Sequence, residues 1–203
     1  ALADTIYLGG AHAAYADDFD WIRGQAPDDI CKTGWGENWL RSKLGFSPFP
    51  HFDDLQHPHP SPSTLQRYWH TPHPHDRTKT KRWLPVEFSR GCPHHCAYCA
   101  VNSYWGKPQR HSPTWISDYL RYLKKEHKIE EIQIEDDSFD LSQEWTWLVI
   151  DILNTLDIAW STPNGIPVKP LLGLDVEQRQ ALSQKCWRVS LPFETGSLAS
   201  AGH

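Results

Sequence analysis

Short apolar runs alternate with helical repeats over the second half of the chain. The runs at 85–89, 129–134, 158–162 and 187–193 are rich in β-branched or aromatic residues and are bounded by polar or turn-forming residues. This pattern predicts four β-strands.

The segments between these runs carry the start signals and periodicity of helices. Ser112 followed by Pro113 predicts a helix start, because a hydroxyl side chain caps the first turn and proline fits its first position. A second helix is expected to open at Asp140 or Ser142. Asp175 with Gln178 resembles a capping box before a third helix. The expected buried faces comprise Ile116, Tyr119, Leu120 and Leu123 in the first helix, and Trp145, Leu148, Val149 and Ile152 in the second.

Strands joined by crossover helices predict an α/β fold with a parallel sheet or barrel. Such folds carry their functional groups at the carboxyl ends of the strands. Polar or reactive residues do follow the predicted strand ends. They are the cysteines after residue 89, Glu135-Asp136-Asp137, Ser161-Thr162 and Glu194.

The first 83 residues have a different character. Thr5–Leu8 and 29–33 predict short strands, Gly9-Gly10 a turn, and 38–44 a short helix. Residues 46–83 are rich in Pro and His and lack any period, so they predict a linker without helix or central strand. Its histidines, among them His57, His59 and His70, are expected to be exposed, with a metal site as the alternative.

Composition narrows the class of protein. The chain has 203 residues, 39% hydrophobic and 22% charged, with a formal net charge of −5. These values predict a globular cytoplasmic protein with no membrane span and no basic surplus for nucleic acid. The chain opens directly into a strand and has no methionine. We therefore interpret it as a fragment of a longer protein.

Three of the five cysteines lie within eight residues, in the sequence Cys92-Pro-His-His-Cys96-Ala-Tyr-Cys99. Three thiolates on one tight loop can hold three corners of a 4Fe–4S cluster and leave one iron open to a ligand. The alternative is a zinc site of three cysteines and one histidine. The separate cysteines, Cys31 and Cys186, are expected to be core residues.

The segment RGCPHHCAYC resembles the signature of the radical S-adenosylmethionine (SAM) superfamily. EIQIEDDSFDLS, IAWSTPNGI and CWRVSLPFETGS are similar to the second, third and fourth strand segments of its subgroup with an N-terminal cobalamin-binding domain. The resemblance covers roughly residues 84–198. It implies the end of a Rossmann-like cobalamin-binding domain at 1–45, a linker at 46–83, and at 84–203 a partial (βα) radical SAM barrel of about four strands.

The resemblance also implies roles for individual residues. Cys92, Cys96 and Cys99 would hold the 4Fe–4S cluster. The expected contacts to SAM are Tyr98, Asp136, Asp137, Ser161 and Glu194. TIYLGGAHAAYADD and TGWGENWL resemble the end of the cobalamin-binding domain, which assigns Gly9 and Gly10 to cobalamin.

The activity implied by the resemblance begins with reductive cleavage of SAM to a 5′-deoxyadenosyl radical. Cobalamin-dependent methyl transfer to a small-molecule substrate is the expected outcome. Cobalamin-assisted cyclisation or ring rearrangement is the alternative within the family, and a non-catalytic zinc- or cluster-binding module is the alternative of another class. The expected partner is an electron donor such as flavodoxin or ferredoxin.

Overall fold

The computed structural model describes residues 5–9, 29–31, 34–70 and 78–192. The chain divides into two compact units. The first comprises Ala1–Leu55 and Gly91–Pro108, and the second comprises Gln56–Arg90 and Gln109–His203. Within the described ranges, no helix combines the length and apolar character needed to cross a membrane.

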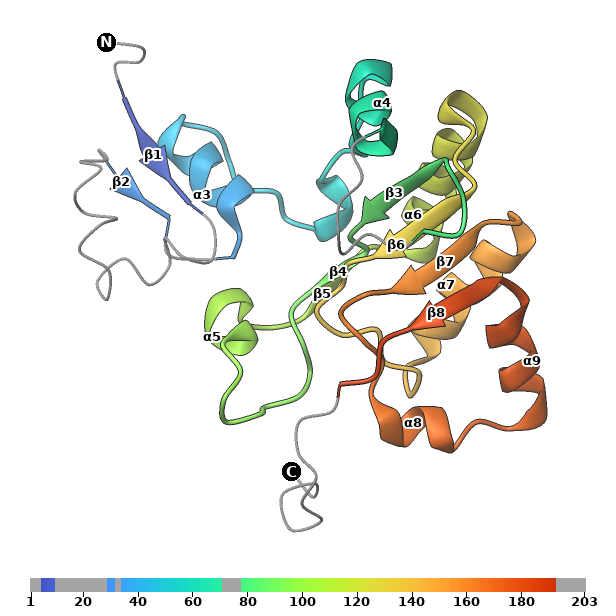
Figure 1. Cartoon of the computed structure of the whole chain (residues 1–203). Coiled ribbons are helices and arrows are strands. Elements are labelled where there is room, and N and C mark those ends of the chain that lie inside the picture. The colour runs from blue at the N-terminus through green and yellow to red at the C-terminus, as the bar shows by residue number, and fades with distance from the viewer. Residues whose placement is uncertain (1–4, 10–28, 32–33, 71–77, 193–203) are drawn as a thin grey trace. The chain divides into compact units, whose positions relative to one another are not determined.

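The second unit is built on a four-stranded parallel sheet with the strand order β3-β6-β7-β8. Each connection between two neighbouring strands of this sheet contains at least one helix, as parallel pairing requires a crossover connection. Figure 1 shows α6 and α7 behind the sheet. The elements are β3 Trp83–Val86, α6 Pro113–Tyr122, β6 Glu131–Ile134, α7 Glu144–Thr155, β7 Ala159–Thr162, α8 Val168–Leu172, α9 Val176–Lys185 and β8 Cys186–Val189. The expected α/β class and parallel sheet are confirmed.

Local sequence signals explain where two of the helices begin. The Ser112 side chain accepts a hydrogen bond from the Trp115 N–H at 3.2 Å, directly before α6. Asp175 and Gln178 form a reciprocal capping box at the start of α9. Both predicted starts are confirmed.

The second predicted helix begins later than expected. Asp140 Oδ1 accepts from the Ser142 N–H at 2.9 Å, which makes a turn, and α7 then begins at Glu144. The predicted buried face of this helix is partly wrong, because Leu148 is 45% exposed. The buried residues of α7 are Thr146, Val149, Ile150 and Leu153.

One face of the sheet forms the core with the helices. Ile132, Ile134 and Trp160 alternate along β6 and β7 and belong to the cluster that also contains Ile116, Leu120 and Val149. The residues between them, Gln133 and Ser161, are paired in register on the other face and are buried too. Burial of strand residues on both faces is typical of parallel α/β proteins.

The prediction that 46–83 contains no helix is wrong, because α4 spans Pro62–His70. The Ser61 hydroxyl accepts from the Thr64 N–H, Pro62 takes the first position, and no further proline or glycine follows up to residue 70. Leu65 is buried, and the Trp69 indole donates to the Trp83 carbonyl at 2.8 Å. Tertiary packing therefore stabilises a helix that the composition argued against.

The expectation of exposed histidines holds only in part. His59 and His70 are exposed, whereas His57 is half-buried. The His57 ring stacks on Tyr119 of α6 at 5.1 Å, and its Nε2 lies 3.0 Å from the Trp115 carbonyl oxygen. His59 makes an edge contact with Tyr122. These rings pack part of the expected linker onto α6.

The first unit contains a two-stranded parallel sheet of β1 Tyr7–Leu8 and β2 Asp29–Ile30. Two helices, α3 Gly36–Lys43 and α5 Val101–Trp105, belong to the same unit. Cys31 follows β2 and is 2% exposed, as expected of a core residue. The pairing is parallel, as in an open α/β sheet, and the assignment to a cobalamin-binding domain stays a prediction.

Candidate functional site

The three clustered cysteines lie in a long loop that we call the cysteine loop, residues 91–108. It leaves after β4 Ser89–Arg90 and returns into β5 Gln109–Arg110, and these two strands pair antiparallel. Gly91 opens the loop at φ +83°, a backbone conformation that favours glycine. A Cβ at this position would also meet Pro108 Cα at 3.2 Å, so the two ends of the loop pass close together.

The thiols of Cys92, Cys96 and Cys99 are free and half-buried, whereas all the residues between them are exposed. The Cys99 N–H donates to the Cys96 carbonyl at 3.0 Å, which closes a turn between the last two cysteines. Asn102 donates from its side chain to the His94 carbonyl. Across the described ranges, no group of three or more His, Cys, Asp or Glu side chains is gathered to hold a metal ion.

The donor set fits an iron–sulfur cluster in its chemistry. Three thiols on one short loop, none of them in a disulfide, can supply three thiolate ligands. Binding would have to draw the three sulfur atoms together, as is common where metal binding and local folding are coupled.

At both ends the chain of the loop continues into the second unit, in two segments that we call the base of the loop, Phe88–Arg90 and Gln109–His111. Phe88 is fully buried, and its carbonyl accepts from the His111 N–H at 2.9 Å. The Arg110 guanidinium lies 5.3 Å from the centre of the Trp145 ring, and the Trp145 indole donates to the His111 carbonyl at 2.8 Å. Trp145 of helix α7 therefore holds β5 and the residue that follows it.

Asp136 holds the other strand of the base. It is 1% exposed; its Oδ1 accepts from the Phe88 N–H and its Oδ2 from the Ser89 hydroxyl, both at 2.7 Å. Burial raises the pKa of Asp136 to about 7, and the hydrogen bonds from Ser89 and Phe88 oppose that rise. The charge of Glu87 adds a smaller upward effect.

The other predicted SAM contacts are placed differently. Asp137 is half-buried, and Tyr98 in the cysteine loop is 70% exposed. Ser161 is fully buried, and its hydroxyl finds no hydrogen-bond partner among the described residues. A buried hydroxyl of this kind fits contact with a ligand or an ordered water. Glu194 lies outside the described residues.

The predicted cobalamin contacts are Gly9 and Gly10. Gly9 follows β1 and is exposed, and Gly10 lies outside the described ranges.

Sequence reasoning missed two contacts near the functional segments. The Asn164 side chain, in the turn after β7, donates to the Glu135 carbonyl at 2.9 Å and so ties two strand ends together. In the first unit, the Gly34 N–H donates to the Tyr104 carbonyl at 2.9 Å, and a Cβ on Gly34 would overlap the Trp105 indole. The glycines of TGWG and the turn residues Pro163-Asn164-Gly165 were the available signals.

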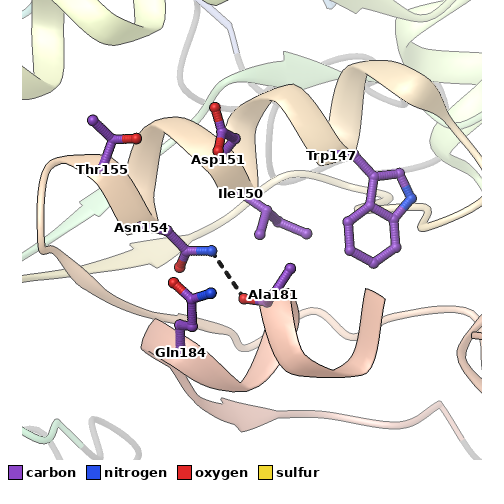
Figure 2. Close-up of a pocket in the computed structure, with 7 residues that line it drawn as sticks. All are labelled: Trp147, Ile150, Asp151, Asn154, Thr155, Ala181 and Gln184. Carbon is purple, nitrogen blue, oxygen red and sulfur yellow. Dashed lines mark hydrogen bonds between the residues drawn. The ribbon is translucent and has the colours of Figure 1, made fainter. Parts of the chain in front are cut away.

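Two pockets lie elsewhere in the second unit. One of about 280 Å³ lies between α7 and α9 (Figure 2), where Asn154 donates to the Ala181 carbonyl at 2.9 Å. The other, of about 370 Å³, runs along β8 beside α9. Neither is lined by a cysteine of the loop or by Asp136. Cys186 is one of the residues that line the second pocket. Burial of its thiol within the protein raises the pKa to about 12, which agrees with a structural role.

No family model and no solved structure matches the chain. Three curated proteins are similar to part of it. Cytidylyl-2-hydroxyethylphosphonate methyltransferase of Streptomyces wedmorensis is 27% identical over 110 residues, which are 53% of this chain and 20% of that protein. An uncharacterised methyltransferase of Pyrococcus horikoshii is 34% identical over 87 residues, 40% of this chain and 18% of that protein.

The third is the anaerobic magnesium-protoporphyrin IX monomethyl ester cyclase of a Synechocystis species. It is 28% identical over 58 residues, 29% of this chain and 12% of that protein. The chain thus spans a fifth or less of the length of these curated relatives. It has distant, partial similarity to methyltransferases and to a cyclase.

Proposed function

We propose that this chain belongs to a radical SAM enzyme that binds a 4Fe–4S cluster through Cys92, Cys96 and Cys99. The observation that carries the proposal is the cysteine loop: three free thiols within eight residues, on a loop whose base is fastened to a parallel sheet. The partial similarity to two methyltransferases and a cyclase supports it.

In this proposal Cys92, Cys96 and Cys99 would hold the cluster as thiolates and would leave one iron without a protein ligand, to which the methionine part of SAM could bind. When bound, the cluster supplies the electron that splits SAM into methionine and a 5′-deoxyadenosyl radical. The chain's own groups bind and orient SAM. The exposed Tyr98 ring offers a flat surface for the adenine, and Asp137 offers a carboxylate for the methionine ammonium group. Ser161 contributes its unpartnered hydroxyl.

Cobalamin-dependent methyl transfer is the overall reaction we propose. Gly9 and Gly10 would contribute to binding cobalamin, which would supply the methyl group. Two of the three relatives are methyltransferases by name. The third is a cyclase, which favours cobalamin-assisted cyclisation as the second candidate. In both cases the chain positions the cofactors and the substrate for a step that the cofactors perform.

Anaerobic reconstitution tests the cluster. The protein should take up about four irons per chain and show a broad iron–sulfur absorption in the visible range. With SAM and dithionite it should release 5′-deoxyadenosine. Cys92→Ala, Cys96→Ala and Cys99→Ala should each abolish this product, whereas the matched controls Cys31→Ala and Cys186→Ala should retain it.

Two results would contradict the proposal. Zinc in place of iron on the three cysteines would make this a zinc-binding module. A bound cluster and bound SAM without 5′-deoxyadenosine, under any reductant, would make it a cluster-binding protein.

A further inference from the structure

Two carboxylates flank strand β6 in the second unit, and both are buried. Glu131 opens the strand and is fully buried, and Asp136 follows its end and is 1% exposed. A buried carboxylate needs hydrogen-bond donors to offset its desolvation, so its partners reveal what it holds. The partners of Asp136 belong to the base of the cysteine loop.

We propose that Asp136 is a positioning residue that fixes the exit of the cysteine loop and does not itself contact SAM. This inference rests on the function proposed above for the role of the cysteines. It departs from the family resemblance, which assigns Asp136 and Asp137 alike to SAM.

Geometry argues against a ligand contact by Asp136. One of its carboxylate oxygens accepts from Phe88 and the other from Ser89, each at 2.7 Å. Both oxygens are therefore already occupied by donors from the chain itself, unlike the buried Ser161 hydroxyl, which has no partner among the described residues. Asp137, in contrast, is half-buried, so a ligand can reach part of its surface.

The same geometry explains how one carboxylate can fix the loop exit. Phe88 is held from two sides, since its N–H donates to Asp136 and its carbonyl accepts from His111. Ser89 is held by Asp136 through its hydroxyl and is paired with Arg110 across the base. Cys92 follows Ser89 by three residues in the chain. A ligand loop needs such support from outside the ligands themselves, because small displacements of ligands weaken binding.

Hydrogen exchange of the purified protein without cluster tests the positioning role directly. Asp136→Ala should speed exchange of the Phe88 and Ser89 amides by about tenfold or more, because the opening of the base becomes easier. Exchange within β7 should stay unchanged. Ser89→Ala removes only the hydrogen bond from the Ser89 hydroxyl and should give a smaller increase in the same segment. This variant tests the proposal if Asp136→Ala does not fold.

The conservative variant separates positioning from charge. In Asp136→Asn the side-chain oxygen can still accept from Phe88, and the amide can donate to the Ser89 hydroxyl. The exchange rates of the Phe88 and Ser89 amides in this variant should therefore stay within about threefold of the wild-type rates. Glu131→Ala is the matched control, because it removes a buried carboxylate from the same strand without touching the base. It should speed exchange at Lys79 and Thr80 much more than at Phe88 and Ser89, which is the reverse of the pattern expected for Asp136→Ala.

Cluster loading and SAM binding complete the experiment. Asp136→Ala should lower iron uptake by at least about half. In the cluster-loaded Asp136→Asn variant, the dissociation constant for SAM should stay within about twofold of the wild-type value. Asp137→Asn should weaken SAM binding with iron uptake unchanged.

The proposal is overturned if Asp136→Ala leaves exchange at Phe88 and Ser89 unchanged. It is also overturned if Asp136→Asn takes up full iron yet loses SAM affinity as Asp137→Asn does. If the wild type takes up no iron, the proposed function fails, while the exchange data still decide whether Asp136 holds the loop.

Discussion

The two ends of strand β6 use the same chemical group for different purposes. At the amino end, Glu131 accepts from the backbone N–H groups of Lys79 and Thr80 at 2.7 Å and from the Trp187 indole at 2.9 Å. At the carboxyl end, Asp136 accepts from Phe88 and Ser89. Glu131 connects the segment before β3 to the start of β8. Asp136 holds the segment that leads from β3 to the cysteine loop.

This difference matches the division of labour in parallel α/β folds. Residues at the amino ends of the strands serve stability, and residues at the carboxyl ends serve the site. Both carboxylates cross-link segments that are far apart in sequence, so their partners, more than their burial, distinguish the roles. Substitutions at the two ends should therefore separate stability from cofactor binding.

The largest effect is expected at the amino end. Glu131→Ala leaves two backbone N–H groups and one indole N–H without their acceptor, so it should lower the free energy of unfolding by about 3 kcal/mol. Urea denaturation measures this loss. Glu131→Gln keeps an acceptor and should lose less. Equal losses for both variants would show that packing, not hydrogen bonding, explains the role of Glu131.

The carboxyl end should make stability depend on pH. The pKa of Asp136 is about 7 when folded, against an ordinary value of 3.8. Between these values the folded protein retains a proton that the unfolded chain has released, so stability falls as pH rises through this range. The loss between about pH 5 and pH 8 should be on the order of 2 kcal/mol greater in wild type than in Asp136→Asn. Identical pH profiles of unfolding would contradict the raised pKa.

A third prediction concerns the support of the cysteine loop within the first unit. Gly34→Ala places a methyl group against the Trp105 indole and should destabilise this contact by about 1.5 kcal/mol, because the ring must move. Iron uptake should fall with it. Gly36→Ala is the matched control, since a Cβ at Gly36 meets nothing within 4 Å. The NMR signal of the Trp105 indole N–H would report the displacement, and an unchanged chemical shift in Gly34→Ala would contradict it.

The smallest effect is expected for the turn after β7. Asn164→Ala removes an exposed hydrogen bond to the Glu135 carbonyl and should change the free energy of unfolding by at most about 1 kcal/mol. It should still weaken SAM binding, because the bond ties two strand ends of the site. Asn154→Ala removes a bond of the same length, 2.9 Å, between α7 and α9, and should leave SAM binding unchanged. Loss of SAM affinity in both variants would show that the turn after β7 matters no more for SAM binding than the contact between α7 and α9.

Much of the fold could be predicted from the sequence, because the signals are local. Ser112 and Asp175 cap helices through atoms a few residues away. Alternating strands and helices predicted the parallel sheet, since only a crossover connection joins parallel strands. The spacing of the three cysteines likewise identified the candidate site within one loop.

Tertiary structure decided the features that depend on distant partners. Helix α4 forms in a Pro- and His-rich segment because Leu65 is buried and Trp69 reaches the Trp83 carbonyl. Asp136 and Asp137 are adjacent and identical in type, but their environments differ. The donors to Asp136 come from residues 47 and 48 positions earlier in the chain. A hydrogen bond across that separation exists only once the sheet has brought β3 beside β6. Spacing along the chain can name both carboxylates, but burial and contact distinguish them.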